Sequence, residues 1–236
     1  PSARFAISDS LDIVDLSNWK YPLIVKPVDC NSSKGVRRVE NINELNTAFS
    51  EAVKLSRTDT AIIEEFISGK ELSIDVYVEN GKVVILDITT SEKLKEKDRF
   101  VIFRTWHPAV VSSIVKRKIQ NVVQKIADSF GISNAPMLVQ MLLNKEDVYV
   151  IEFSARTGGG LKYISIEQRA GVDIISAVID LTLGIKPHIE VREPLTRYMV
   201  DEYIYCYPGV YDHVDGFEDL KEKDIITAVN GAKIGV

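Results

Sequence analysis

Four polar residues near the middle of the chain could together hold a metal ion and a phosphate group. Gln140 and Glu152 each interrupt an apolar run, and the polar turn at 144–147 predicts a hairpin between them. In a hairpin both side chains can lie on one face of adjacent strands, within reach of one ion. Glu152, Ser154 and Arg156 alternate along the second strand and therefore share a face. Carboxylate, amide and hydroxyl oxygens suit Mg2+, which also keeps waters and substrate phosphates among its ligands.

A structural interpretation of the same residues competes with this one. Buried charges in proteins are usually paired, and Glu152 could be a buried carboxylate that pairs with Arg156. These residues alone leave both interpretations open, and segments upstream favour the metal and phosphate chemistry.

A loop of small residues after an apolar strand could bind phosphate. The strand at 23–27 carries Lys26 and ends at a proline, which cannot donate a hydrogen bond to a sheet. The small residues at 29–35 leave backbone N–H groups free, and such groups bind phosphate oxygens with a lysine adding charge. An ordinary hairpin turn is the competing interpretation of the loop, and a solvated strand end that of Lys26.

A third segment could bind the base and the sugar of a nucleotide. The apolar strand at 61–67 ends at Ser68-Gly69, where unpaired backbone groups could read the edge of adenine. Glu71 follows closely and could bind ribose hydroxyls. The competing interpretation is a charged strand edge followed by an exposed turn.

These residues must be positioned by strands and helices together. Alternating residues at 71–79 and 82–90, joined by Asn80-Gly81, predict a hairpin. Apolar residues at helical spacing predict a helix over 112–130. Asn41 with Glu44 three residues later predicts the start of a helix that runs to about residue 55.

Other segments complete the α+β pattern. We further predict a strand near 36–39, a long polar loop over 91–108, a helix over 173–183 and short strands after residue 197. Helices mixed with antiparallel hairpins indicate the α+β class.

Composition narrows the class of protein. The chain has 236 residues, 45% hydrophobic and 27% charged, as in a globular protein with one large domain or two small lobes. A net charge of -5 argues against nucleic acid, and we expect no membrane partner because no apolar run is long enough to span one. Two cysteines without disulfide-like spacing favour a reducing compartment, so we expect a cytoplasmic protein. The scattered histidines argue against zinc and are expected at surface or loop positions: His107, His188 and His213.

The ordered set of segments resembles the ATP-grasp superfamily over about residues 21–187. The segments are Val25-Lys26-Pro27, the small-residue loop, Glu64-Glu65-Phe66-Ile67 with Gly69 and Glu71, the alternating hairpin, and Gln140 followed by Glu152-Phe153-Ser154 and Arg156. Within the superfamily the chain is most similar to carboxylate–amine ligases and the carbamoyl-phosphate-synthase-like group. The resemblance implies two α+β lobes with mainly antiparallel sheets: a small lobe over 1–67, a large lobe over 68–196, and strands and turns over 197–236. This last part would complete the large lobe or begin a further subdomain.

The resemblance also implies a role for individual residues. Lys26 and Arg156 would be catalytic, because they offset charge at the transferred phosphate. The implied nucleotide-binding residues are Lys26, the flap residues Ser32, Ser33, Lys34 and Gly35, the adenine segment Glu64, Glu65, Phe66 and Ile67, the ribose-binding Glu71, and Leu142 under the base. The implied ligands of Mg2+ (or Mn2+) are Gln140, Glu152 and Ser154. Candidates for contact with the acceptor substrate are Arg104 and His107 in the expected loop, with Gly158 and Gly159.

The implied reaction joins a small-molecule carboxylate to an amine through an acylphosphate made with ATP. Three departures from the family pattern bear on it: Ser154 stands where Asn is usual, Gly35 is the one glycine of the flap, and the preceding N-terminal domain is absent. We therefore expect a fragment of a longer protein, one that begins at Pro1 without Met and could be inactive by itself. A nucleotide-binding module with reduced or no ligase activity is the alternative, and a purely structural α+β interaction domain is a third. The oligomeric state stays open, with a homodimer as the candidate because dimers are common in these families.

Overall fold

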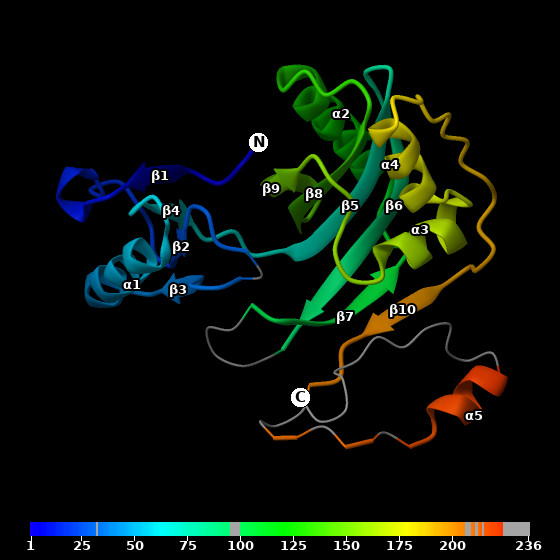
Figure 1. Cartoon of the computed structure of the whole chain (residues 1–236). Helices are drawn as coiled ribbons and strands as arrows, with labels where there is room; N and C mark the ends of the chain where they lie inside the picture. The colour runs from blue at the N-terminus through cyan, green and yellow to red at the C-terminus, as the bar shows by residue number, and fades with distance from the viewer. Residues whose placement is uncertain (32, 95–99, 206–208, 211, 214, 224–236) are drawn as a thin grey trace. The chain divides into compact units, whose positions relative to one another are not determined.

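The computed structural model describes residues 1–31, 33–94, 100–205, 209–210, 212–213 and 215–223. The chain divides into two compact units, Pro1–Glu202 and Tyr203–Val236. The first unit contains two antiparallel sheets with helices, which confirms the predicted α+β class (Figure 1). The second unit contains helix α5 (Phe217–Glu222).

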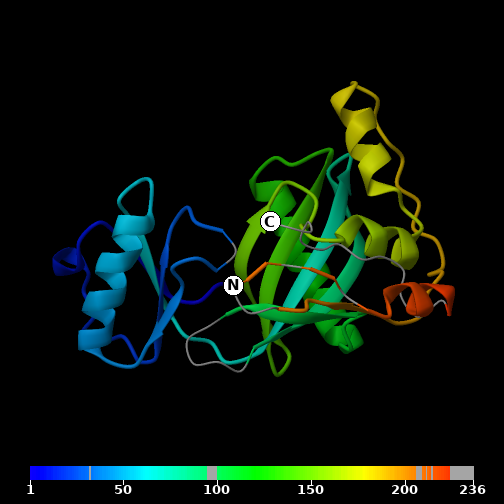
Figure 2. The same cartoon turned by 60° about the horizontal axis from the view of Figure 1, so that its bottom comes forward.

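The smaller sheet is built from the beginning of the chain and has the strand order β1-β4-β2-β3. Its strands are β1 (Phe5–Ser8), β2 (Leu23–Pro27), β3 (Arg37–Val39) and β4 (Ala61–Glu65), and the 3-10 helix η1 (Leu11–Ile13) follows β1. Helix α1 (Ile42–Leu55) covers one face of this sheet, where it buries a cluster that includes Leu23, Val25 and Ile63 (Figure 2). Because side chains alternate along a strand, Lys26 and Glu64 lie on the face away from α1.

Helix α1 begins where the sequence predicts it. The amides of Asn43 and Glu44 donate to Asn41 Oδ1 at 3.1 Å each, and the Glu44 carboxylate accepts from the Glu40 amide at 2.8 Å. These bonds satisfy backbone donors that the first turn of a helix leaves without partners.

The larger sheet has six strands in the order β10-β7-β6-β5-β8-β9. Its strands are β5 (Lys70–Glu79), β6 (Lys82–Lys93), β7 (Ile102–His107), β8 (Ala135–Asn144), β9 (Asp147–Ser154) and β10 (Met199–Glu202). Helix α2 (Ser113–Ser129) packs on one face, and helices α3 (Lys162–Ala170) and α4 (Ile174–Thr182) pack on the other (Figure 1).

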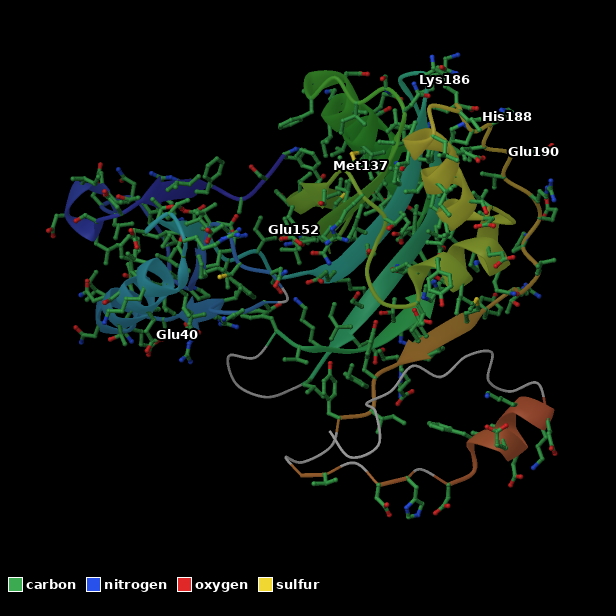
Figure 3. The ribbon with its side chains drawn as sticks, viewed as in Figure 1. Glu40, Met137, Glu152, Lys186, His188 and Glu190 are labelled. Carbon is green, nitrogen blue, oxygen red and sulfur yellow. The ribbon has the colours of Figure 1, made fainter. Side chains whose placement is uncertain are left out.

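The two faces of this sheet differ in chemistry. Leu72, Ile74 and Val76 of β5 point to α2 and join the largest apolar cluster, which also contains Met137 of β8 (labelled in Figure 3). The residues between them belong to the opposite face: Glu71, Ser73, Asp75 and Tyr77. Helices α3 and α4 bury Tyr77 in an apolar cluster. The polar residues of this face, Glu71, Ser73 and Asp75, are not part of that cluster.

Two predictions about the elements need correction, and one helix was missed. The prediction of a long loop over 91–108 is wrong, because β6 continues to Lys93 and β7 begins at Ile102. His107 is wrong as a surface or loop residue, because it lies in β7 with 1% of its surface exposed. Helix α3 was not predicted; three glycines precede it, and its N-cap residue, Leu161, makes no side-chain capping bond. The hairpin of β5 and β6, β3, α2 and α4 are confirmed.

Candidate functional site

Gln140 and Glu152 lie directly opposite each other on β8 and β9, as the hairpin predicted. Gln140 pairs with Glu152 whereas Met141 pairs with Val150, so Ile151 is an extra residue, a β-bulge. Val148 and Val150 point into the core below the sheet, and without the bulge Glu152 would point there too. The bulge therefore turns Glu152 and Ser154 to the polar face, where Ser154 stands opposite Leu138.

Glu152 is exposed, and Gln140 and Ser154 are half-buried (Glu152 is labelled in Figure 3). Among the described residues no ion pair joins Glu152 to Arg156, whose Nη1 donates instead to the carbonyl of Thr157 at 2.7 Å. The interpretation of Glu152 as a buried carboxylate paired with Arg156 is therefore wrong. One exposed carboxylate, one amide and one hydroxyl remain as an oxygen donor set that fits Mg2+.

The proposed donor set carries little negative charge, because Glu152 is its one carboxylate. Among the residues that the structure describes, no group of three or more His, Cys, Asp or Glu side chains could hold a metal ion. A metal bound at Glu152 would thus depend on neutral oxygens and on phosphate oxygens for its remaining ligands. This is the ligand set expected where the ion arrives with a nucleotide.

Lys26 and Glu64 form an ion pair of 2.7 Å between β2 and β4. Their side chains are 20% and 17% exposed, so the pair is partly screened by water. Arg38 of β3 is on the same face, with its guanidinium 4.5 Å from the ring of Phe66. This face therefore presents two cations and an aromatic ring beside the predicted adenine segment.

The predicted flap is a turn with partly committed amides. The Lys34 amide donates to the Asn31 carbonyl at 3.1 Å and the Val36 amide to the Ser33 carbonyl at 3.2 Å. Gly35 has φ +76°, and a Cβ there would lie 2.8 Å from Leu55 Cδ1. Both the backbone conformation and the lack of space therefore favour glycine at this position. Ser33 and Lys34 are exposed, while Ser32 lies outside the described residues. Phosphate binding by the backbone here would use the other amides of the loop, because those of Lys34 and Val36 already donate within the turn.

The predicted adenine segment also has some of its backbone occupied. The Glu65 amide donates to the Arg4 carbonyl at 3.0 Å, and the Phe66 amide donates to the Pro22 carbonyl at 3.1 Å. Within the described part of the chain, the backbone of Ile67 has no such loop or turn bond. Ile67 is therefore the position in this segment best able to bond a base.

Glu71, the predicted ribose-binding acid, is 9% exposed and forms an ion pair with Lys93 of β6. Lys93 was not among the predicted site residues. Leu142 stands opposite Glu71 on β8 and is half-buried. The strand order brings these three residues together from separate parts of the sequence.

Three further charged residues on the polar face were also missed: Lys162, Asp75 and Asp87, the last of which contacts the predicted substrate residue His107. Lys162, the first residue of α3, lies 2.8 Å from Asp75 Oδ2, and His107 Nδ1 lies 2.6 Å from Asp87 Oδ2. The other ring nitrogen of His107 lies 3.0 Å from Asp201 Oδ2. Burial lowers the pKa of His107, but the hydrogen bonds to Asp201 and Asp87 outweigh it and the pKa is raised. Polar residues at alternate positions of otherwise apolar strands were the available signal for Asp75 and Asp87.

The predicted substrate contacts are dispersed. Arg104 donates to both carboxylate oxygens of Glu202, at 3.0 and 2.9 Å, and His107 is enclosed by its two aspartates. Gly158 lies against Asp75, whereas Gly159 has open space around it. Of the predicted substrate contacts, the glycine loop that follows β9 therefore lies against the polar face, whereas Arg104 and His107 of β7 are paired with other side chains.

The chain combines two antiparallel sheets, a lysine on the smaller sheet, and a glutamine–glutamate pair on a polar strand face of the larger one. The chain belongs to the ATP-grasp domain family, which matches residues 19–164. The predicted ATP-grasp fold and its resemblance to the carboxylate–amine ligase group are confirmed.

The chain is similar to several ATP-grasp enzymes. It is 31% identical to a formate-dependent phosphoribosylglycinamide formyltransferase of Prochlorococcus marinus (strain NATL1A) over 161 residues, which are 66% of this chain and 40% of that protein. It is 29% identical to a D-alanine–D-alanine ligase of Azobacteroides pseudotrichonymphae over 58% of this chain and 44% of that protein. Among solved structures, the L-amino acid ligase from Bacillus licheniformis has a TM-score of 0.77 and 26% identity, over 94% of this chain and 54% of that one. The chain therefore spans about half or less of the proteins it matches.

No helix in the described parts of the chain is long and apolar enough to cross a membrane.

Proposed function

We propose that this chain is the nucleotide- and metal-binding part of an ATP-dependent ligase that joins a carboxylate to an amine. The observation that carries the proposal is the pairing of Gln140 with Glu152 on an exposed polar face of the sheet. The family and the likeness to an L-amino acid ligase support the same reaction class. The substrates would be a small-molecule carboxylate and a small-molecule amine.

The proposed reaction has two balanced steps. A carboxylate oxygen attacks the γ-phosphorus of ATP, the bond from that phosphorus to the ADP oxygen breaks, and an acylphosphate and ADP result. The amine nitrogen then attacks the acyl carbon, phosphate leaves, and the nitrogen loses a proton. Such chemistry asks the protein mainly for positioning and for charge neutralisation.

Several residues would supply that neutralisation. Glu152, Gln140 and Ser154 would hold Mg2+ against phosphate oxygens, and the ion would draw charge from the transferred group. Lys26 would offset charge on the phosphates, and would exchange part of its pairing with Glu64 for the nucleotide. Arg156 is exposed and free to turn toward the transferred phosphate, because it is held only by the neighbouring Thr157 carbonyl among the described contacts.

The nucleotide itself would use residues of both sheets. We assign the base to Ile67 and Leu142, the ribose to Glu71, and the phosphates to Lys26 and the flap at 32–35. Residues 1–67 and 68–196 would be the two lobes that share it. The position of Glu71 suits a ribose site, since its carboxylate is held beside Lys93 and its oxygens can accept from two hydroxyls.

An acylphosphate can be captured directly in the complete protein. Incubation with Mg-ATP, hydroxylamine and a panel of amino acids, sugar acids and bicarbonate should yield a hydroxamate and ADP in equal amounts with the right carboxylate. Glu152→Gln should abolish the hydroxamate, while Glu146→Gln in the turn of the same hairpin should not. ADP formation without any hydroxamate over the whole panel would contradict an acylphosphate route.

A second candidate is a nucleotide-binding module with little or no ligase activity. The specific observation in its favour is the low charge of the metal donor set, with Ser154 in place of a longer amide side chain. This candidate predicts Mg-ATP binding by the complete protein with neither ADP nor hydroxamate formed.

A further inference from the structure

The loop at 155–161 connects β9, which carries Glu152 and Ser154, to the start of α3. It contains Arg156 and three consecutive glycines. Glycine has the largest backbone freedom to lose, so such a loop is ordered only if neighbouring groups restrict it. The Arg156 amide donates to the Ser154 carbonyl at 2.9 Å, and the course of the loop beyond this bond depends on what holds the glycines.

Gly158 is held by close contact with the sheet and with α3. A Cβ on Gly158 would lie 2.7 Å from Asp75 Oδ1, 2.8 Å from Lys162 Cγ and 3.3 Å from Lys162 Cβ. Its φ is not in the left-handed region, so the glycine is required here for space. Gly159 differs, because a Cβ there would meet nothing within 4 Å.

The two side chains that Gly158 touches form a buried ion pair. The Asp75 side chain is 3% exposed and the Lys162 side chain 12%, with 2.8 Å between Nζ and Oδ2. Lys162 Nζ also donates to Thr89 Oγ1 at 3.2 Å, so the ammonium is held by β5 and β6 together. Removing either partner of such a buried pair would leave an uncompensated charge, so we expect the two side chains to stay together.

The position of Lys162 is not explained by the helix that it begins. A cation at a helix N-terminus is opposed by the helix dipole, and the first turn of α3 holds no acidic residue to compensate it. Asp75 supplies the compensating charge from the sheet instead. The position of Lys162 is therefore explained by its contact with Asp75 of the sheet.

The pair stands next to the proposed metal site. On the polar face Asp75 is in one row with Leu138 and Ser154, and the adjacent row on that face contains Ser73, Gln140 and Glu152. Contacts that hold Gly158 on Asp75 therefore also restrict where Arg156 can lie, since Arg156 is two positions before Gly158 and four positions after Glu152.

We propose that Lys162 is a positioning residue for the ligase site: together with Asp75 it holds Gly158, and through Gly158 it sets the place of Arg156. The inference deepens the proposed function and rests on it for the role of Arg156. Lys162 itself, with its ammonium committed to Asp75 and Thr89, acts through the loop and does not contact the reacting atoms.

Hydrogen exchange followed by mass spectrometry tests this in the complete protein without a substrate. Lys162→Met should raise exchange of the peptide 155–161 by about tenfold or more, with little change in α2. Lys162→Arg should restore most of the protection, because it keeps a cation beside Asp75. Gly158→Ala, which keeps both charged side chains but places a methyl group against them, should also raise exchange in 155–161, and Gly159→Ala is the matched control that should not.

The contrary outcomes are equally distinct. If Lys162 only anchors α3, exchange should rise in 163–170 and stay unchanged in 155–161. That result, or an equal rise for Gly158→Ala and Gly159→Ala, would overturn the proposal. Mg-ATP affinity measured on the same samples separates the two claims. Loss of loop protection with normal affinity supports the positioning role, whereas failure of every sample to bind Mg-ATP contradicts the proposed function and leaves the exchange result valid.

Discussion

Gln140 and Glu152 face each other on one side of the β8–β9 pair because a single extra residue, Ile151, interrupts the alternation of β9. The strand buries Val148 and Val150 before the bulge and Phe153 after it. The same strand can therefore contribute to the core and still place a carboxylate on the opposite face. We propose that this change of face along β9 creates the metal site.

Glu152→Gln should weaken the effect of Mg2+ on ATP binding by about tenfold or more, because the change removes the one exposed carboxylate of the donor set. Its cost to stability should be small, since Glu152 is exposed and has no ion pair among the described residues. Calorimetric titration with ATP at fixed Mg2+ measures the affinity, and thermal melting measures stability.

Lys26→Met should lower ATP affinity by about tenfold, because the phosphates lose a charge-assisted hydrogen bond. Loss of its pair with Glu64 should cost about 1–3 kcal/mol of stability, because the largely buried Glu64 carboxylate is left without its partner. Lys54→Met on the other side of the small sheet is the matched control. Equal affinities for the two variants would exclude Lys26 from the nucleotide site.

His107 should make stability depend on pH. Its folded-state pKa is raised, since its hydrogen bonds to Asp201 and Asp87 outweigh burial and the nearby charge of Lys162. A raised pKa means that the stabilisation is complete below the ordinary value of about 6.5 and is lost as pH rises through the folded-state value. The melting temperature should therefore fall from pH 6.5 to 9, and fall less steeply in His107→Gln. Parallel curves for the two proteins would show that the histidine carries no such linkage.

Asn41→Ala should destabilise the protein by about 1 kcal/mol, because two amides at the start of α1 lose their acceptor. The expected fall in melting temperature is about 2–4 °C. Asn43→Ala, at the exposed second position of the helix, should change the melting temperature by less. If both substitutions have the same effect, the capping bond is not what stabilises this end.

Local patterns predicted the elements whose signals lie within one segment. The turn at Asn80-Gly81 and the cap at Asn41 are local, and both predictions are confirmed. Strand β7 was missed because its residues have no simple alternation, and their partners come from β6 and β10 instead. Helix α3 was missed because its first lysine is stabilised by Asp75, a residue distant in the sequence.

The site residues also divide into those that a local pattern predicts and those that depend on contacts between distant segments. The proximity of Gln140 and Glu152 follows from a short hairpin and could be predicted from the sequence. The pairs Glu71–Lys93 and Asp75–Lys162 depend on which strands and helices become neighbours, so no local pattern identifies the partners. The amides already used within the flap and the adenine segment were likewise invisible, because their acceptors are set by turn and sheet geometry.

The most direct test of the account is calorimetric titration of the complete protein with ATP, with and without Mg2+. We expect ATP binding that strengthens with Mg2+ in the wild type and loses this dependence in Glu152→Gln. Absence of ATP binding in both conditions would contradict the central claim that this polar face, together with Lys26, is a Mg-ATP site.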